Sequence, residues 1–208
     1  MHLHGLYAIT DNRLTPSPVL LDNVEQALRG GAQILQYRDK TNDSRKRLQE
    51  ALALKDLCAS YHCYFIINDD IDLCAASGAD GVHLGLSDSN IIDARNLLGP
   101  KTIIGATCHG SLELAQQAVS ESADYVAFGR FFSSNTKPNA PLANLESVSR
   151  GLKNLSVPAV AIGGITLNHA DQLIESGFSM LAVIEDIFKL GTITSQCEAY
   201  QQAFARHD

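Results

Sequence analysis

The chain has 208 residues, of which 45% are hydrophobic and 19% charged, so it is long enough and apolar enough to bury the core of one globular domain. Its formal net charge of −7 argues against nucleic acid or an anionic membrane as the main partner, and any phosphate site must be built from local charges. No apolar run reaches membrane-spanning length and no signal-like segment opens the chain, so we expect a soluble, cytoplasmic protein.

Short apolar runs alternate with longer amphipathic stretches along the whole chain. The expected strands are residues 6–10, 34–38, 64–68, 81–84, 102–106, 125–128, 159–162 and 180–183. Helices are expected at residues 23–29, 44–61, 91–98, 112–121, 145–152 and 170–176, and a further helix should begin at Ile71. This alternation predicts an α/β fold, a single (β/α)8 TIM barrel spanning residues 1–208, with a doubly wound open sheet as the alternative.

The second strand ends in an amide and two cations. Gln36, Arg38 and Lys40 alternate along the extended chain, so their side chains share one side of it. If that side faces the barrel axis, the three side chains form an anion clamp with one orienting hydrogen bond. The alternative is a solvated surface cluster of Arg38, Asp39 and Lys40.

The third and fourth strands are followed by carboxylates. Asn68, Asp69 and Asp70 end the third strand, and Asp69 or Asp70 should cap the helix that follows, which leaves the other without that role. Asp69 and Asp88 follow neighbouring strands and form a carboxylate pair suited to Mg²⁺, although Asp88 could instead cap a helix. His83 fits a packed barrel histidine better than a metal ligand.

Three polar residues follow the fifth strand. Thr107 could hydrogen-bond a substrate. Cys108 and His109 could form a nucleophile–base pair, but adjacent side chains on an extended chain point to opposite sides, which argues against it. The five cysteines are odd in number and contain no CxxC pair, so neither a disulfide framework nor a structural zinc site is expected.

The loop after the sixth strand, GRFFSSNTKPNAP, carries hydroxyl groups and one lysine but no carboxylate. Ser133, Ser134, Thr136 and Lys137 could together hold a phosphate, and a plain polar connection is the alternative.

After the seventh strand, Gly163 and Gly164 precede a helix and would let backbone N–H groups approach a second phosphate. Two anion sites, one beside a metal-binding pair, predict two phosphorylated ligands that are joined with loss of phosphate or pyrophosphate.

Seven segments resemble the thiamine-phosphate synthase family in order and spacing, over nearly the whole chain. They are LYAITD, QYRDK, IND, GVHLG-x-x-D, IGATCH, ADYVAFGRFFSSNTKPNAP and VAIGGIT, and their wording is similar to the gammaproteobacterial branch. The resemblance implies a TIM-barrel transferase that couples 4-amino-2-methyl-5-hydroxymethylpyrimidine diphosphate to 4-methyl-5-hydroxyethylthiazole phosphate. Mg²⁺ would be its cofactor and these small molecules its partners. The oligomeric state stays open, a homo-oligomer included.

The resemblance also implies roles by motif position. The pyrimidine diphosphate would be contacted by Gln36, Arg38, Lys40, Asn68 and Lys137, while Asp69 and Asp88 would hold Mg²⁺. Thr107 stands where the family usually has a serine near the pyrimidine. The thiazole phosphate would be contacted by Ser134, Thr136 and the backbone of Gly164. The residues expected to act in the catalytic step are Arg38, Lys40, Thr107 and Lys137.

Three positions depart from the family pattern. Leu86 replaces a usual glutamine, and Arg130 stands where many relatives have proline. The eighth strand reads AVIEDIF, which puts Ile184 and Glu185 near the thiazole phosphate, where only their backbone groups are expected to contact it. The alternatives are a thiazole tautomerase-like enzyme, with His109 moving a proton, and a non-catalytic regulatory barrel that binds phosphate. The retained diphosphate motifs favour the synthase.

Overall fold

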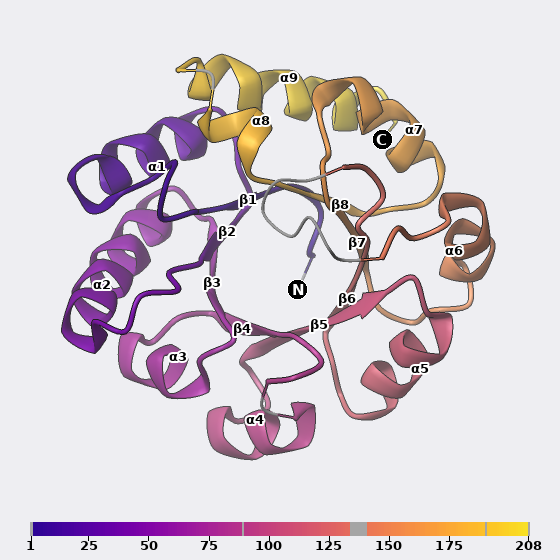
Figure 1. Cartoon of the computed structure of the whole chain (residues 1–208), viewed down its shortest axis with the longest axis horizontal. Helices are drawn as coiled ribbons and strands as arrows, with labels where there is room; N and C mark the ends of the chain where they lie inside the picture. Colours follow the sequence, from indigo (N-terminus) through magenta and orange to yellow (C-terminus); the bar gives the residue numbers. More distant parts are fainter. Residues whose placement is uncertain (1, 89, 134–140, 190, 208) are drawn as a thin grey trace.

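The structure, a computed structural model, describes residues 2–88, 90–133, 141–189 and 191–207. Its eight parallel strands close into a barrel in chain order, with β8 paired to β1 (Figure 1). The strands are β1 (Gly5–Ile9), β2 (Ile34–Tyr37), β3 (Tyr64–Asn68), β4 (Gly81–Leu84), β5 (Ile103–His109), β6 (Tyr125–Phe128), β7 (Ala159–Ile162) and β8 (Met180–Val183). The predicted TIM barrel is confirmed and the open sheet is wrong.

Helices surround the strands (Figure 1). They are α1 (Leu20–Arg29), α2 (Ser44–Ser60), α3 (Ile71–Ser77), α4 (Ile91–Leu98), α5 (Leu112–Ser120), α6 (Leu145–Leu152), α7 (Ala170–Glu175), α8 (Glu185–Phe188) and α9 (Ile193–Ala205), with short 3₁₀ turns at Ser17–Val19 and Leu167–His169. The sequence did not predict α8 or α9. Helix α9 packs against α1, α7 and β1, so it completes the ring of helices where the chain returns to its start.

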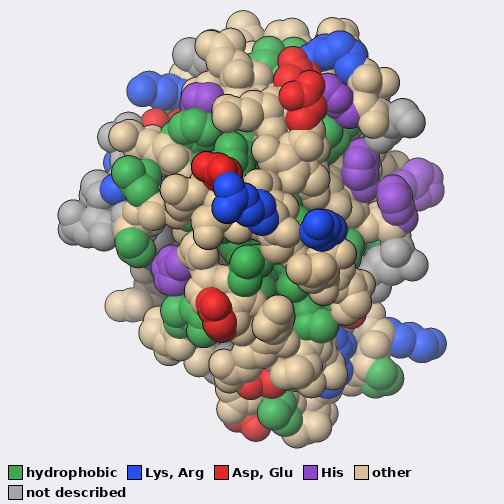
Figure 2. All heavy atoms as spheres, turned by 90° about the vertical axis from the view of Figure 1, so that its right-hand side faces the viewer, with side chains coloured by type: hydrophobic (Ala, Val, Ile, Leu, Met, Phe, Trp, Pro, Cys, Tyr) green, Lys and Arg blue, Asp and Glu red, His purple; other side chains and the backbone are tan. Residues whose placement is uncertain are grey.

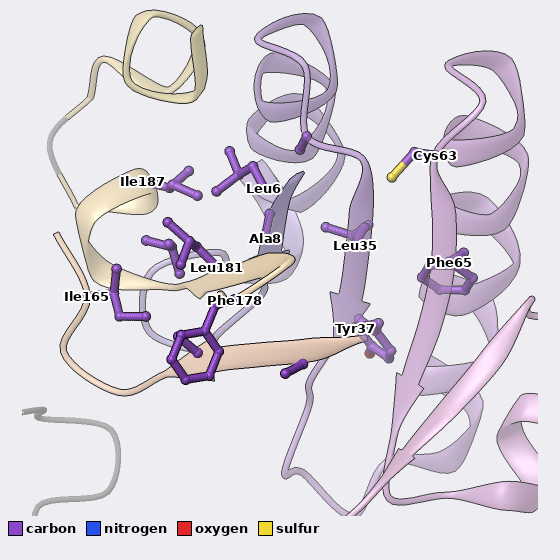
Figure 3. Close-up of a cluster of buried hydrophobic side chains, with 14 of the residues drawn as sticks. Leu6, Ala8, Leu35, Tyr37, Cys63, Phe65, Ile165, Phe178, Leu181 and Ile187 are labelled. Atoms are coloured by element: carbon purple, nitrogen blue, oxygen red, sulfur yellow. The ribbon is translucent and has the colours of Figure 1, made fainter. Parts of the chain in front are cut away.

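Side chains alternate between two apolar layers along the strands, as parallel strands buried on both faces require. One layer lies between the sheet and the helices, and Leu6, Leu35, Phe65 and Leu181 belong to it (Figure 3). The other fills the barrel, with Tyr7, Ile34, Ile66, Ile103, Tyr125, Val160 and Met180 among its members. The interior positions continue to the carboxyl ends of the strands, where polar residues occupy them.

Side-chain caps begin several of the helices and decide which acidic residues are left for other roles. Asp70 caps α3 and accepts a hydrogen bond from the backbone N–H of Leu73 at 2.8 Å. Asn90, not Asp88, caps α4. Asp69 and Asp88 therefore have no capping role.

Figure 2 shows the side of the barrel on which α6 lies, where acidic and basic side chains are interspersed without a large area of one sign. Exposed ion pairs of this kind contribute little to stability. Within the described ranges, each helix is too short or too polar to cross a bilayer. This side of the barrel thus presents no strong field of one sign.

Candidate active site

The carboxyl ends of the strands surround a pocket of about 680 Å³. Most of the predicted site residues line it, namely Gln36, Arg38, Lys40, Asn68, Asp69, Asp88, Thr107, Gly164, Ile184 and Glu185. Ser134, Thr136 and Lys137 lie outside the described residues, so the structure does not place them. Arg130 and Leu86, two of the departures from the family pattern, also line the pocket, and Leu86 is 60% exposed there.

The cations after β2 enter the pocket as the alternation predicts. Asp11 forms an ion pair with Arg38, whose Nη1 lies 3.4 Å from Asp11 Oδ2. The Arg38 side chain is only 15% exposed. Lys40 forms an ion pair with Asp69, which directly follows β3. Asp11 was not a predicted site residue, although it ends the LYAITD segment. Both cations thus line the pocket, and each forms an ion pair with a different carboxylate.

Asp39 fixes the same turn from outside the pocket. Its carboxylate, only 2% exposed, pairs with Lys46 of α2 and accepts a hydrogen bond from the backbone N–H of Thr41 at 2.6 Å. Burial by itself would raise the pKa of Asp39, but these hydrogen bonds outweigh burial and lower the pKa below its usual range. The surface-cluster alternative is therefore wrong, because Asp39 is buried and faces away from its neighbours.

Replacing Asp39 by asparagine should lower the free energy of unfolding by about 2 kcal/mol at pH 7. The pKa of Asp39 is lower in the folded state than in the unfolded state, where it is about 4. The charged carboxylate therefore stabilises the folded protein fully when the pH is above about 4, and this stabilisation is lost as the pH falls toward the folded-state pKa. Urea unfolding of wild type and Asp39→Asn should therefore converge as pH is lowered from 5 toward 2. Asp43→Asn is the matched control, since asparagine caps α2 equally well. If the difference in unfolding free energy between wild type and Asp39→Asn stayed constant with pH, the stabilising role of the Asp39 charge would be contradicted.

Asp69 and Asp88 are hydrogen-bonded to each other at the ends of β3 and β4. Burial opposes ionisation of Asp69, but hydrogen bonds from Lys40 and Asp88 prevail and lower its pKa. Burial and the hydrogen bond to Asp69 raise the pKa of Asp88, which also accepts from the backbone N–H of Gly85 at 2.7 Å. The pair therefore favours sharing one proton beside an ammonium group.

This donor set fits Mg²⁺, which prefers hard oxygen ligands. The described residues hold no cluster of three or more His, Cys, Asp or Glu side chains that could bind a metal by themselves. Magnesium commonly takes one or two carboxylates and completes its shell with phosphate oxygens and water. Asp69 and Asp88 can supply the protein's share of such a shell.

A chain of polar side chains crosses the barrel interior beneath these charges. The hydroxyl groups of Tyr7 and Tyr125 lie 2.8 Å apart, and Gln36 Nε2 donates to Tyr7 at 2.8 Å. His83 Nδ1 lies 2.9 Å from the Tyr125 hydroxyl and His83 Nε2 lies 2.9 Å from Thr107 Oγ1. His83 is thus bonded through both ring nitrogens. Sequence reasoning missed both tyrosines, although each stands at an interior position of its strand.

Cys108 and His109 do not form a nucleophile–base pair. Strand β5 continues through both residues, and Cys108 lies in the layer between sheet and helices while His109 lines the pocket. Burial raises the pKa of Cys108 to about 12, so it remains a thiol. All five cysteines are free and buried.

The glycine turn after β7 packs against the start of the loop after β6. The Phe132 backbone N–H donates to the Gly163 carbonyl at 3.0 Å. Gly164 has φ 65°, and a Cβ there would lie 2.2 Å from the Ser133 carbonyl oxygen. Only glycine fits this contact, so the turn and the first residues of the loop form one wall of the pocket.

Asp186 supports that wall from α8. Its Oδ2 accepts hydrogen bonds from the Leu167 backbone N–H at 3.0 Å, from Gln196 Nε2 at 2.7 Å and from the Tyr200 hydroxyl at 2.8 Å. Both side-chain donors come from α9, which ties the glycine turn to the last helix. Asp186 was not predicted, because its role depends on a helix that the sequence reading did not include.

Known proteins resemble this chain over most of its length. A family model described as thiamine monophosphate synthase matches residues 6–187. A thiamine-phosphate synthase of Marinobacter nauticus is 50% identical over 205 residues, which cover 98% of this chain and 92% of that protein. One of Saccharophagus degradans is 52% identical over 186 residues, covering 89% and 86%. The solved structure of a thiamine phosphate pyrophosphorylase from Pyrococcus furiosus has a TM-score of 0.89 at 32% identity and covers 97% of this chain and 96% of its own.

Proposed function

The chain belongs to the thiamine monophosphate synthase family and is a transferase of thiamine synthesis with thiamine-phosphate synthase activity; from this premise we propose how its pocket performs the reaction. The substrates are 4-amino-2-methyl-5-hydroxymethylpyrimidine diphosphate and 4-methyl-5-hydroxyethylthiazole phosphate, and the products are thiamine phosphate and pyrophosphate. The observation that carries the proposal is one pocket with paired carboxylates and cations on one side and a glycine turn in another wall.

The diphosphate is bound by Arg38 and Lys40, with Asn68 beside them. Both cations already line the pocket, so binding requires only that their side chains change partner. Asp69 and Asp88 would hold Mg²⁺, which when bound supplies positive charge to the diphosphate oxygens. Lys40 can then turn from Asp69 to the diphosphate.

The reaction is a dissociative substitution. The bond between the pyrimidine methylene carbon and the diphosphate oxygen breaks, and the electron pair leaves with pyrophosphate. Arg38 and Lys40 stabilise the negative charge that develops on the leaving group. The amino group of the ring delocalises the positive charge on the methylene carbon, and the thiazole nitrogen lone pair then forms the new carbon–nitrogen bond. Thr107 and Gln36 hold the pyrimidine ring, and no protein nucleophile is needed.

The thiazole phosphate is bound at the wall formed by the glycine turn. Backbone N–H groups at Gly164, Ile184 and Glu185 are its proposed contacts, together with the side chains of Ser134 and Thr136, which lie outside the described residues. Gly164, Ile184 and Glu185 line the same pocket as the cations, which supports bringing both substrates together. Backbone donors suit this position because they bind an anion without adding a charge next to Glu185.

Mixing purified protein with both substrates and Mg²⁺ tests the activity. Formation of thiamine phosphate and pyrophosphate in equal amounts is the expected result. Exchange of a thiazole proton without coupling would favour the tautomerase alternative, and phosphate binding without either reaction would favour a regulatory barrel.

Replacing Lys137 by alanine is expected to lower kcat/KM for the pyrimidine diphosphate about a hundredfold, because one cation on the leaving group is lost. The free energy of unfolding should change by less than about 0.5 kcal/mol, because the sequence predicts an exposed loop at this position. Lys153→Ala, at the exposed end of α6, is the control. Unchanged turnover in Lys137→Ala would remove this residue from the mechanism.

The substrates are small molecules, and neither nucleic acid nor a membrane is proposed as a partner. We place the enzyme in the cytoplasm and treat residues 1–208 as one catalytic domain, and a homo-oligomer is the assembly to be tested. Size-exclusion chromatography with light scattering would determine that assembly directly.

A further inference from the structure

In the buried chain of hydrogen bonds beneath the pocket, the number of available hydrogens determines which group donates in each bond. It runs through Gln36, Tyr7, Tyr125, His83 and Thr107, and each of the five side chains comes from a different strand. Gln36 and Thr107 are its two ends, and both line the pocket. Hydrogen-bonded groups in such a chain constrain one another, because each hydroxyl has one hydrogen to donate.

Three bonds connect Tyr7 to Thr107, and four hydrogens serve them. Tyr7, Tyr125 and Thr107 each contribute one hydroxyl hydrogen, and a neutral His83 imidazole contributes one. Burial raises the pKa of Tyr7 and of Tyr125, so both phenols keep their hydrogens. One hydrogen is therefore left over, and it belongs to one of the three hydroxyl groups.

Burial decides which hydroxyl keeps the spare hydrogen. Tyr7 also lines the pocket, but Tyr7 and Tyr125 are each only 1% exposed, so a hydrogen left over on either phenol would be a buried donor with no acceptor in the chain. Thr107 is partly exposed and lines the pocket. The favoured arrangement has Tyr7 donating to Tyr125, Tyr125 donating to His83 Nδ1, and His83 Nε2–H donating to Thr107.

We propose that this chain is a specificity-determining element, which holds the Thr107 hydroxyl as a hydrogen-bond donor toward the pocket. Thr107 already accepts from His83, so its own hydrogen is the one directed at a ligand. At the other end, Gln36 directs its amide nitrogen to Tyr7, and its amide oxygen is the group that can accept from a ligand. Tyr7, Tyr125 and His83 are positioning residues, because they act through the two ends.

The ligand that matches this pattern is a flat heteroaromatic ring with an unprotonated ring nitrogen and an amino group. The nitrogen accepts from Thr107 and the amino group donates to Gln36. The choice of this ligand rests on the proposed function, in which the aminopyrimidine ring of the diphosphate substrate lies between Gln36 and Thr107. A 4-oxo analogue inverts the pattern, since it carries a carbonyl in place of the amino group and a hydrogen on the adjacent ring nitrogen. A site built to bond one pattern rejects the other strongly.

Binding of three ligands, each alone, tests the inference by calorimetry. They are the aminopyrimidine diphosphate, its 4-oxo analogue and inorganic pyrophosphate. The wild-type enzyme should bind the amino ligand at least about thirtyfold more tightly than the oxo analogue. Tyr125→Phe interrupts the chain without changing the size of the ring. His83 can then change tautomer and accept the Thr107 hydrogen at Nε2, which lets the Thr107 oxygen accept from a ligand without leaving its own hydrogen unpaired. The preference should then fall below about fivefold, with the dissociation constant for pyrophosphate unchanged. Tyr61→Phe, a tyrosine bonded to Glu25 outside the pocket, is the matched control.

A double-mutant cycle with Thr107→Val separates positioning from general loosening of the site. If Tyr125 acts through Thr107, the double variant should bind the amino ligand no more weakly than Thr107→Val alone. Thr107→Ser keeps the hydroxyl and should keep the preference. Additive losses, equal weakening of pyrophosphate, or a wild-type preference below threefold would each overturn the inference. Formation of thiamine phosphate without the binding preference would overturn this inference alone. The binding preference without formation of thiamine phosphate would leave it standing and overturn only the proposed function.

Discussion

Replacing Asp69 by asparagine should reduce kcat about a thousandfold, which corresponds to roughly 4 kcal/mol of transition-state stabilisation. Three interactions meet at this carboxylate, because its Oδ2 pairs with Lys40 and accepts from Asn68 Nδ2 at 2.6 Å, and it shares a hydrogen bond with Asp88. Asparagine removes the charge while keeping the size of the side chain. It also tolerates the left-handed backbone at this position, where φ is 65°.

Steady-state kinetics at several Mg²⁺ concentrations checks the expectation. Asp69→Asn should need more Mg²⁺ for half-maximal rate and should not recover the wild-type kcat when Mg²⁺ is saturating. Its thermal unfolding should stay close to that of wild type. Asp72→Asn, an exposed acidic residue in the first turn of α3, is the matched control and should retain full activity. If Asp69→Asn came within threefold of wild type, the paired carboxylates would have no role in the reaction.

The barrel and the positions of its charged residues could be predicted because both follow from local alternation. Gln36, Arg38 and Lys40 are two residues apart on an extended chain, so their side chains point to the same side of it. Once one of them is assigned to the pocket, the other two follow. Helix capping is equally local: Asp70 caps α3, so Asp69 is left for the pocket. Local rules were sufficient wherever the residue's neighbours in sequence decide where its side chain points.

Contacts between distant segments were not predicted. Helix α9 had a readable signal, since Ile193, Cys197, Tyr200 and Phe204 recur at helical spacing and are all buried. Without that helix, the support that Asp186 gives to the glycine turn could not be anticipated. The same limit applies to the buried polar chain: a tyrosine at an interior strand position is expected to pack, and only the closed barrel shows what its hydroxyl meets.

Replacing Gly105 by alanine is expected to destabilise the protein by about 3 kcal/mol, because it adds a methyl group where the Tyr125 ring crosses the barrel. A Cβ at Gly105 would lie 2.0 Å from Tyr125 Cζ and 2.3 Å from its hydroxyl oxygen. The two residues are partners in the register of β5 and β6, so neither backbone can move without disturbing the sheet. The ring must shift, and its bonds to Tyr7 and His83 are then lost.

Urea unfolding of Gly105→Ala, alone and combined with Tyr125→Leu, separates collision from loss of glycine as such. Leucine has no atoms at the position of Cζ or the hydroxyl, so the double variant should be more stable than Gly105→Ala alone even though Tyr125→Leu by itself destabilises a packed core. Gly78→Ala is the matched control, since a Cβ there meets nothing within 4 Å and only its φ of 63° opposes alanine, at a cost of about 1 kcal/mol. If the two losses were additive, the collision would not be the cause. Recovery on adding Tyr125→Leu would instead mean that Gly105 is needed because it leaves the space in which Tyr125 reaches His83.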